Sequence, residues 1–286
     1  MVPLLGRRSC GRPGANRSRL DARTGLSHNP LLLLSVENAI DIRNAHRDHG
    51  EVLAAIVRET IERRGRVIVP AFAVGRVEEV IYWLKRLEEE KRIPVVPVYL
   101  DSPMAVDALR HYANRSHDLD PEMQARRGQM GAFTTRRFTA VTSPRQSQDL
   151  QAGTAPAIII SSSGMAAGGR VLWHLKTALS DPHNTVLFVG YQAEGTRGRH
   201  LLEGAREVKI HGRYIPVGAQ IASIDSMSAH ADANEILRWL GGFRKAPART
   251  FLVHGEPAAQ KALCTRIEQE LGWAPYIPDY AETVEL

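Results

Sequence analysis

Short apolar runs alternate along the chain with stretches whose apolar residues recur at helical spacing. The apolar runs, rich in β-branched residues and closed by Ser, Pro, Asp or Gly, are expected to form buried strands. They span residues 31–37, 66–74, 94–101, 156–161 and 185–190. The helical stretches between them span residues 51–64, 74–90, 102–113 and 169–179. This alternation predicts an α/β protein with a largely parallel sheet and helices on its faces.

The remainder of the chain is patterned less evenly. Two short strands joined by His211-Gly212 are expected within 208–224, followed by a capped helix over 228–240. A strand at 249–253 and a helix over 261–271 precede an extended end. Residues 114–155 are irregular and rich in arginine, which fits either a solvated helix and loop or a basic rim for a polyanion.

Charge is concentrated at the start of the chain. The 286 residues include 37 Lys plus Arg and 31 Asp plus Glu, a formal net charge of +6. Six arginines and one aspartate fall within residues 1–30, so the rest holds 31 basic against 30 acidic residues. This Arg-, Gly- and Pro-rich segment has no apolar period, and we expect a disordered tail. An RNA-touching arm and a mis-started or out-of-frame segment are the alternatives.

Composition excludes several classes of protein. A hydrophobic fraction of 43% suffices for a real core, which argues against a disordered chain. Cys10 and Cys264 lie far apart and suggest no disulfide framework, so a reducing, cytoplasmic setting is expected. The longest apolar run, residues 30–34, is far below the roughly 20 residues that cross a bilayer, which predicts no membrane contact.

A Ser- and Gly-rich segment follows the predicted strand at 156–161. Its sequence, SSSGMAAGGR, joins that strand to a helix that opens near Gly169. Free backbone N–H groups and a positive helix end at such a turn are suited to phosphate. The glycine spacing matches neither a Walker loop nor the dinucleotide fingerprint, so a tight turn that needs glycine for its backbone is the alternative.

Three histidine-containing stretches could carry chemistry. His230 and His254 stand where a predicted strand gives way to a helix, the edge at which open α/β sheets place their sites. A hydrogen-bonded structural histidine is the more common use of such a position. His46, Asp48 and His49 look like part of a His-x-His-x-Asp-His metal motif, but they precede a long helix, which favours coincidence.

Six segments taken together resemble one known family. They are collinear along the chain, at residues 64–76, 100–105, 162–170, 188–192, 228–232 and 252–256. In sequence they are RGRVIVPAFAVGR, LDSPMA, SSGMAAGGR, FVGYQ, SAHAD and LVHGE. In this order they resemble the β-CASP branch of the metallo-β-lactamase superfamily, whose members are nucleases that process RNA.

The resemblance implies roles for individual residues. Glu37 stands at the position of the motif A acid, His230 at that of the motif B histidine and His254 at that of the zinc-ligating motif C histidine. In the family, the motif A acid orients the motif B histidine near the scissile phosphate. A histidine at motif C is associated with RNA substrates. The implied activity is zinc-dependent hydrolysis of RNA phosphodiester bonds, with two zinc ions and RNA as the partner.

The resemblance also assigns the Ser/Gly-rich segment to phosphate or RNA binding. The residues assigned in this way are Ser162, Ser163, Gly164, Gly168, Gly169 and Arg170. Family members are often dimers, so a homodimer is implied, whereas an unpaired sheet edge would favour aggregation instead.

The chain departs from the family in its metal ligands. Of the usual set only His254 is present, and one imidazole cannot hold a catalytic zinc that needs about three protein ligands. We therefore expect an N-terminally truncated chain that does not retain zinc and cleaves RNA little or not at all. The alternative is a catalytically dead RNA-binding or partner-assembly module.

The expected domain organisation follows from the same resemblance. Residues 1–30 form the Arg-rich tail, and 31–49 the end of a metallo-β-lactamase segment with motif A. Residues 50–190 form a β-CASP domain of parallel sheet and flanking helices. Residues 191–286 form the C-terminal portion of a metallo-β-lactamase αββα domain of the RNA-metabolising type.

Overall fold

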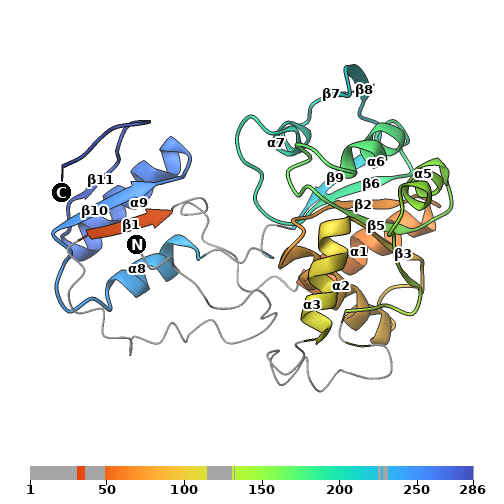
Figure 1. Cartoon of the computed structure of the whole chain (residues 1–286), viewed down its shortest axis with the longest axis horizontal. Coiled ribbons are helices and arrows are strands. Elements are labelled where there is room, and N and C mark those ends of the chain that lie inside the picture. Colours follow the sequence, from red (N-terminus) through yellow and green to blue (C-terminus); the bar gives the residue numbers. More distant parts are fainter. Residues whose placement is uncertain are drawn as a thin grey trace. The chain divides into compact units, whose positions relative to one another are not determined.

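A computed structural model describes residues 31–35, 49–114, 131, 133–224, 227 and 231–285 (Figure 1). The described residues divide into two compact units. The first contains those between 49 and 227, and the second contains 31–35 together with 231–285. The predicted domain boundary at 190/191 falls within the first unit and stays a prediction.

The first unit is built on a six-stranded parallel sheet with the strand order β4-β3-β5-β2-β6-β9. Its strands are β2 (Val67–Pro70), β3 (Val98–Asp101), β4 (Phe138–Ala140), β5 (Ile158–Ser161), β6 (Thr185–Phe188) and β9 (Gln220–Ser223). Every residue of β2, β5 and β6 is buried, as expected for a parallel sheet covered on both faces. The predicted α/β architecture is confirmed.

Helices cover both faces of this sheet (Figure 1). One face packs on α1 (His49–Glu62), α2 (Arg76–Glu89) and α3 (Pro103–Asn114), and the other on α5 (Pro144–Ala152), α6 (Val171–Ala178) and α7 (Arg197–Leu202). Strand β5 supplies both cores, because successive side chains of a strand point to opposite faces. Ile158 and Ile160 join the core of the first face, whereas Ile159 joins that of the second.

A small antiparallel hairpin lies beside this sheet. It comprises β7 (Glu207–Ile210) and β8 (Arg213–Pro216), which are joined by the predicted turn at His211 and Gly212. The two strands expected within 208–224 are in fact three, because β9 leaves the hairpin and pairs with β6 in the main sheet. Val208 and Ile210 of β7 are buried in the same core as α6 and α7, so the hairpin is part of the first unit.

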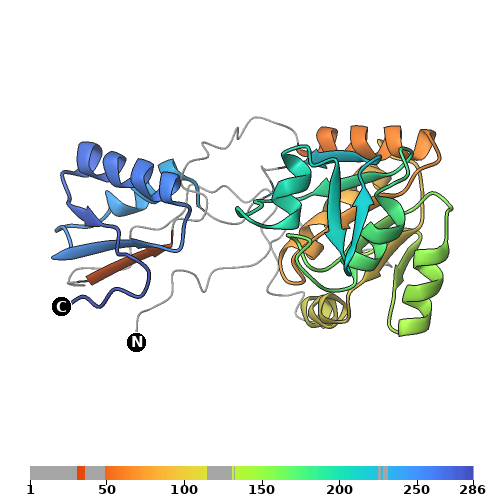
Figure 2. The ribbon, with the colours of Figure 1, turned by 90° about the horizontal axis from the view of Figure 1, so that it is seen from above.

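The second unit is a three-stranded parallel sheet with two helices packed into one core. The strands β1 (Leu31–Ser35), β10 (Arg249–Val253) and β11 (Pro275–Tyr276) lie in the order β1-β10-β11. Helices α8 (Ala233–Leu240) and α9 (Pro257–Leu271) accompany this sheet (Figure 2). Their buried leucines share one core with those of β1 and β10. The predicted cap of α8 is present, since Asp232 and Glu235 form a capping box.

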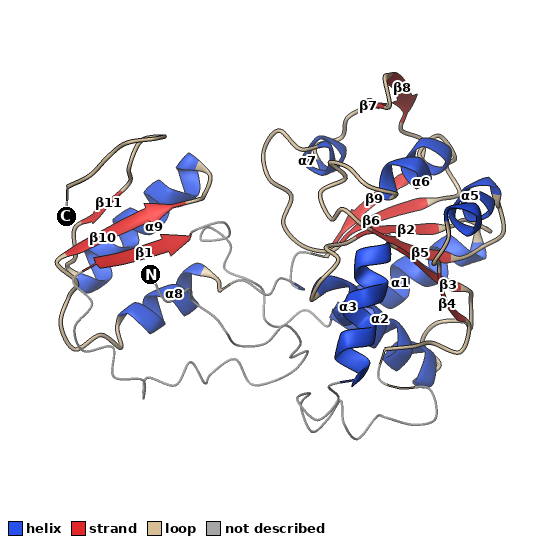
Figure 3. Cartoon of the chain, viewed as in Figure 1, coloured by secondary structure: helices blue, strands red, loops and turns tan. Residues whose placement is uncertain are grey.

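The region 114–155 contains the solvated helix that is one of its two expected uses, together with a short strand that its pattern does not predict. Strand β4 and helix α5 lie within it (Figure 3). Helix α5 buries only Ser147, so no apolar stripe marks it in the sequence. Its start was nevertheless visible, because Ser143 and Gln146 form a capping box around Pro144.

Across the described part of the chain, no helix combines the length and the apolar character that crossing a membrane requires.

Candidate functional site

The Ser/Gly loop, residues 162–170, connects the carboxyl end of β5 to the first turn of α6. The loop is closed by its own hydrogen bonds. The Ser163 amide donates to the Gly168 carbonyl at 3.3 Å, and the Val171 amide donates to the Ser162 carbonyl at 3.2 Å. The Ser163 hydroxyl accepts from the amides of Ala167 and Gly168 at 3.2 and 3.4 Å. Several of the backbone amides that were expected to bind an anion therefore donate to other atoms of the loop and hold its conformation.

Glycines in this loop serve different purposes. Gly169 has φ +76°, and a Cβ there would lie 2.5 Å from the Ser162 carbonyl oxygen, so this position requires glycine. A Cβ at Gly164 would come within 2.8 Å of the Phe72 ring. A Cβ at Gly168 would meet nothing within 4 Å, so this glycine leaves open space beside the loop.

Asp101 anchors the loop from the end of the neighbouring strand β3. Its side chain is fully buried. One carboxylate oxygen accepts from Nη1 of Arg170 at 2.7 Å. The other accepts from the Ser147 hydroxyl at 2.6 Å and from Nε2 of His174 at 2.7 Å. The Ser161 hydroxyl donates to the Asp101 backbone carbonyl at 2.8 Å.

These contacts determine the charge of the Asp101 side chain. Burial raises the pKa of Asp101, but hydrogen bonds from His174, Ser147 and Arg170 together outweigh burial and hold the pKa below its ordinary value. Asp101 is thus a carboxylate at neutral pH and fixes Arg170 by a charge-assisted hydrogen bond. The sequence signal for it was an acid at the end of an apolar strand, within the LDSPMA segment.

Arg170 is the cation of this site. Its side chain is 24% exposed, and Nη1 is its only nitrogen with a hydrogen-bond partner among the described residues. The Ser162 hydroxyl oxygen is buried and likewise lacks a partner there. A held and partly exposed guanidinium on a loop with open space at Gly168 suits a phosphate group.

Two residues hold the other side of the loop by hydrogen bonds: Gln192, which precedes α7, and Arg197, which is the first residue of α7. The Gln192 side-chain amide donates to the Gly164 carbonyl at 3.1 Å. The Arg197 guanidinium donates to the Ala166 carbonyl and, at 3.0 and 2.8 Å, to the Lys209 carbonyl in β7. The loop is therefore tied both to α7 and to the hairpin.

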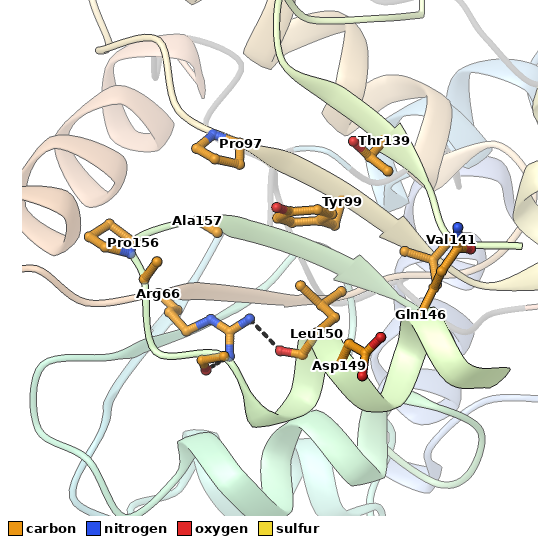
Figure 4. A pocket seen from close by; sticks show the side chains of 12 residues that line it. Arg66, Pro97, Tyr99, Thr139, Val141, Gln146, Asp149, Leu150, Pro156 and Ala157 are labelled. Atoms are coloured by element: carbon orange, nitrogen blue, oxygen red, sulfur yellow. Dashed lines mark hydrogen bonds between the residues drawn. The ribbon is translucent and has the colours of Figure 1, made fainter. Parts of the chain in front are cut away.

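A cavity of about 340 Å³ lies elsewhere in the same unit, between helix α5 and the strands β3 and β4, and reaches the segments that precede β2, β3 and β5 (Figure 4). Arg66, Tyr99 and Leu150 are among its lining residues. The Arg66 guanidinium donates to the carbonyls of Gly153 and Leu150 at 2.6 and 2.8 Å. Burial lowers the pKa of Arg66. The Ser/Gly loop lies at the carboxyl ends of the strands, so this cavity is separate from it.

His254 lies in the second unit, directly after β10 as the sequence predicts. It is exposed and adopts φ 56°. Glu37 and His230, the other predicted catalytic residues, lie outside the described residues. Only His254 and the Ser/Gly loop can therefore be located, each in its own unit.

Two family models match the chain, each to one part. The Beta-Casp domain matches residues 77–201, and the Zn-dependent metallo-hydrolase RNA specificity domain matches residues 214–278. The chain belongs to the β-CASP branch of the metallo-β-lactamase superfamily.

Relatives in this family cover most of the chain. It is 34% identical over 260 residues to the transcription termination factor FttA of Pyrococcus abyssi, an alignment covering 87% of this chain and 39% of the relative. Ribonuclease TTHA0252 of Thermus thermophilus is 36% identical over 222 residues, covering 76% of this chain and 50% of the relative. The RNase J-like protein of Methanocaldococcus jannaschii is 31% identical over 267 residues, covering 93% and 61%. The chain thus spans about two-fifths to three-fifths of the length of these β-CASP relatives.

The described residues do not fit the zinc that the β-CASP family uses. Among them, no group of three or more His, Cys, Asp or Glu side chains is arranged to hold a metal ion. His46 and Asp48 lie outside the described residues. His49, at the first position of α1, contacts the Trp83 ring edge-to-face at a centroid distance of 6.3 Å.

Proposed function

We propose that this chain binds the phosphate backbone of RNA through the Ser/Gly loop and Arg170, as the RNA-gripping part of a β-CASP nuclease. The observation that carries the proposal is the 2.7 Å contact between Arg170 and the buried carboxylate of Asp101. A guanidinium fixed in this way loses less conformational freedom on meeting phosphate than a mobile surface arginine does. The RNA specificity domain matched at residues 214–278 supports RNA as the polyanion.

Ser162, Ser163, Gly164, Gly168 and Gly169 complete the proposed phosphate site. In this scheme the open space at Gly168 admits the phosphate close to the backbone, while Ser162 is assigned to the site from the family resemblance. Ser163 and Gly169 hold the loop in shape and Gly164 allows its packing on Phe72. Each contact with phosphate adds sequence-independent affinity, which falls as salt concentration rises.

Cleavage is the second part of the proposal. We infer from family membership that RNA phosphodiester hydrolysis uses Glu37 and His230 as catalytic residues and His254 as a metal ligand. A catalytic zinc site requires about three protein ligands, and the described residues offer no such set. The chain by itself is thus proposed to bind RNA and to cleave it little or not at all.

A direct test combines binding, cleavage and metal content on the same preparation. Fluorescence anisotropy of a labelled single-stranded RNA, measured across a salt series, reports binding. Gel analysis of the same RNA reports cleavage, and elemental analysis reports zinc. Salt-dependent binding without cleavage is the expected result. Stoichiometric zinc, with RNA cleavage that His254→Ala abolishes, would overturn the proposed inactivity but leave the binding site standing.

A partner-assembly module without RNA contact is the alternative function. It would leave Arg170 and the Ser/Gly loop without a phosphate ligand. RNA binding that is absent at low salt would favour this alternative.

A further inference from the structure

An exposed aromatic pair lies one helical turn beyond the proposed phosphate site. Trp173 projects from the first turn of α6 and is 45% exposed. Its ring lies against that of His211, in the turn between β7 and β8, with a centroid distance of 4.1 Å and an interplanar angle of 43°. Both side chains are exposed, so the pair is a surface feature and not part of the core.

Lysines stand over the exposed rings of this region. Nζ of Lys176 lies 5.2 Å from the centroid of Trp173. In the hairpin, Nζ of Lys209 lies 5.6 Å from the centroid of Tyr214, which is 63% exposed. An aromatic face with a neighbouring cation provides both parts of a nucleotide contact, stacking for the base and attraction for the phosphate.

The aromatic pair is held in a fixed relation to the Ser/Gly loop. Arg170 adopts helical backbone angles at the N-cap of α6, three residues before Trp173. Residues three apart on a helix are neighbours on its surface, with a rise of about 4.5 Å. Arg197 ties the hairpin that carries His211 to the loop, through the carbonyls of Lys209 and Ala166.

The burial pattern of α6 indicates that the Trp173 side chain is not required to pack this helix against the sheet. The neighbouring residues Val171, Leu172 and Leu175 are buried and supply the contacts of this helix with the sheet. A large exposed aromatic side chain among cations is a common feature of surfaces that bind single-stranded nucleic acid.

We propose that Trp173, with His211 and Lys176, forms a stacking platform for a base of single-stranded RNA whose backbone is held at Arg170. This inference rests on the proposed function and extends it from phosphates to bases. Because every base offers an aromatic face, the platform accepts any sequence and favours unpaired RNA over duplex. Lys176 then pairs with the phosphate next to the stacked base.

The test compares variants in RNA affinity with a short labelled oligouridine at low salt. Trp173→Ala is expected to weaken binding about 10-fold, while Trp173→Phe keeps most of the affinity. The slope of affinity against salt should stay unchanged for both variants, because no phosphate contact is removed. Tyr280→Ala, which removes a fully exposed aromatic ring from the second unit, serves as the matched control.

A measurement on the unaltered protein removes any dependence on variant folding. Ultraviolet crosslinking to 5-bromouridine RNA, followed by mass spectrometry, should label the peptide that contains Trp173 or His211. Unchanged affinity in Trp173→Ala, or crosslinks confined to other peptides, would overturn the platform while RNA binding itself persists. Failure of the unaltered protein to bind RNA at all would instead overturn the proposed function.

Discussion

Two buried carboxylates in the first unit meet opposite surroundings. Asp101, at the end of β3, receives hydrogen bonds from three side chains that lie far apart in the sequence. Glu78, in the first turn of α2, is only 3% exposed, and no side chain among the described residues donates a hydrogen bond to its carboxylate. Burial raises the pKa of Glu78, and the nearby amides of Glu78 and Gly75 offset this only in part, whereas the pKa of Asp101 is lowered.

The difference shows that burial alone does not determine whether the pKa of a carboxyl group is raised or lowered; its hydrogen-bond partners decide. Asp101 is buried because its charge organises Arg170 and His174 around the Ser/Gly loop. Glu78 is buried by the packing of α2, and its charge costs stability at neutral pH.

The largest effect is expected from removing the charge of Asp101. Asp101→Asn should lower the free energy of unfolding by about 3 kcal/mol, because Arg170 and His174 lose their anionic partner. RNA affinity should fall as well, since Arg170 is no longer fixed. Urea unfolding and anisotropy measure the two effects.

Asp107→Asn is the matched control for this substitution. Asp107 pairs with Arg110 at 3.1 Å, but its side chain is 74% exposed, so a change within about 0.5 kcal/mol is expected. Equal losses for the two variants would show that Asp101 has no special role.

Removing the proposed phosphate contact itself should have a smaller effect on folding. Arg170→Gln is expected to weaken RNA binding about 10-fold at low salt and to reduce the salt slope by about one. Arg110→Gln, at a side chain that is 65% exposed on α3, should leave both quantities unchanged. An unaltered salt slope in Arg170→Gln would place the phosphate elsewhere.

Glu78 should respond in the opposite direction to Asp101. Glu78→Gln is expected to raise the free energy of unfolding at pH 7 by about 1 kcal/mol, because it removes a buried charge that no cationic side chain offsets. RNA affinity should not change. Glu59→Gln, at an exposed position of α1, is the control, and a loss of stability in Glu78→Gln would reveal a partner for the carboxylate.

The smallest effect is expected in the pH dependence of the contributions that Glu78 and Asp101 make to the free energy of unfolding. The raised pKa of Glu78 means that its destabilising charge is neutralised first, as pH falls toward the ordinary value of 4.5. The lowered pKa of Asp101 means that its stabilising charge persists and is lost only below 3.8. Urea unfolding from pH 7 to pH 3, compared with the two neutral variants, should show this order, and the reverse order would contradict the assignment.

Local patterns were enough to predict most strands and helices but not the anchor of the loop. The segment from β5 through the Ser/Gly loop to α6 is continuous in sequence, and its apolar strand and glycines identify it directly. The partners of Asp101 are 46, 69 and 73 residues away along the chain, so no local spacing could associate them. His174 also lies on the mostly apolar helix α6, and nothing in the sequence around it indicates that it donates a hydrogen bond to Asp101.

Helix α5 shows why the bounds of a solvated helix within 114–155 could not be predicted. Hydrophobic periodicity identifies elements that bury apolar stripes, and α5 buries a serine instead. Ser147 is useful there because it donates to Asp101. Glu37 and His230 remain predictions from the family resemblance.

The three consecutive isoleucines of β5 also bear on the dynamics of the protein. A strand whose side chains belong to the cores on both faces cannot leave the sheet without exposing apolar surface on both faces. We expect its amides to exchange with deuterium only through opening of the whole first unit. The Ser/Gly loop therefore starts from one of the most slowly exchanging segments of this unit, which limits how far RNA binding can displace it.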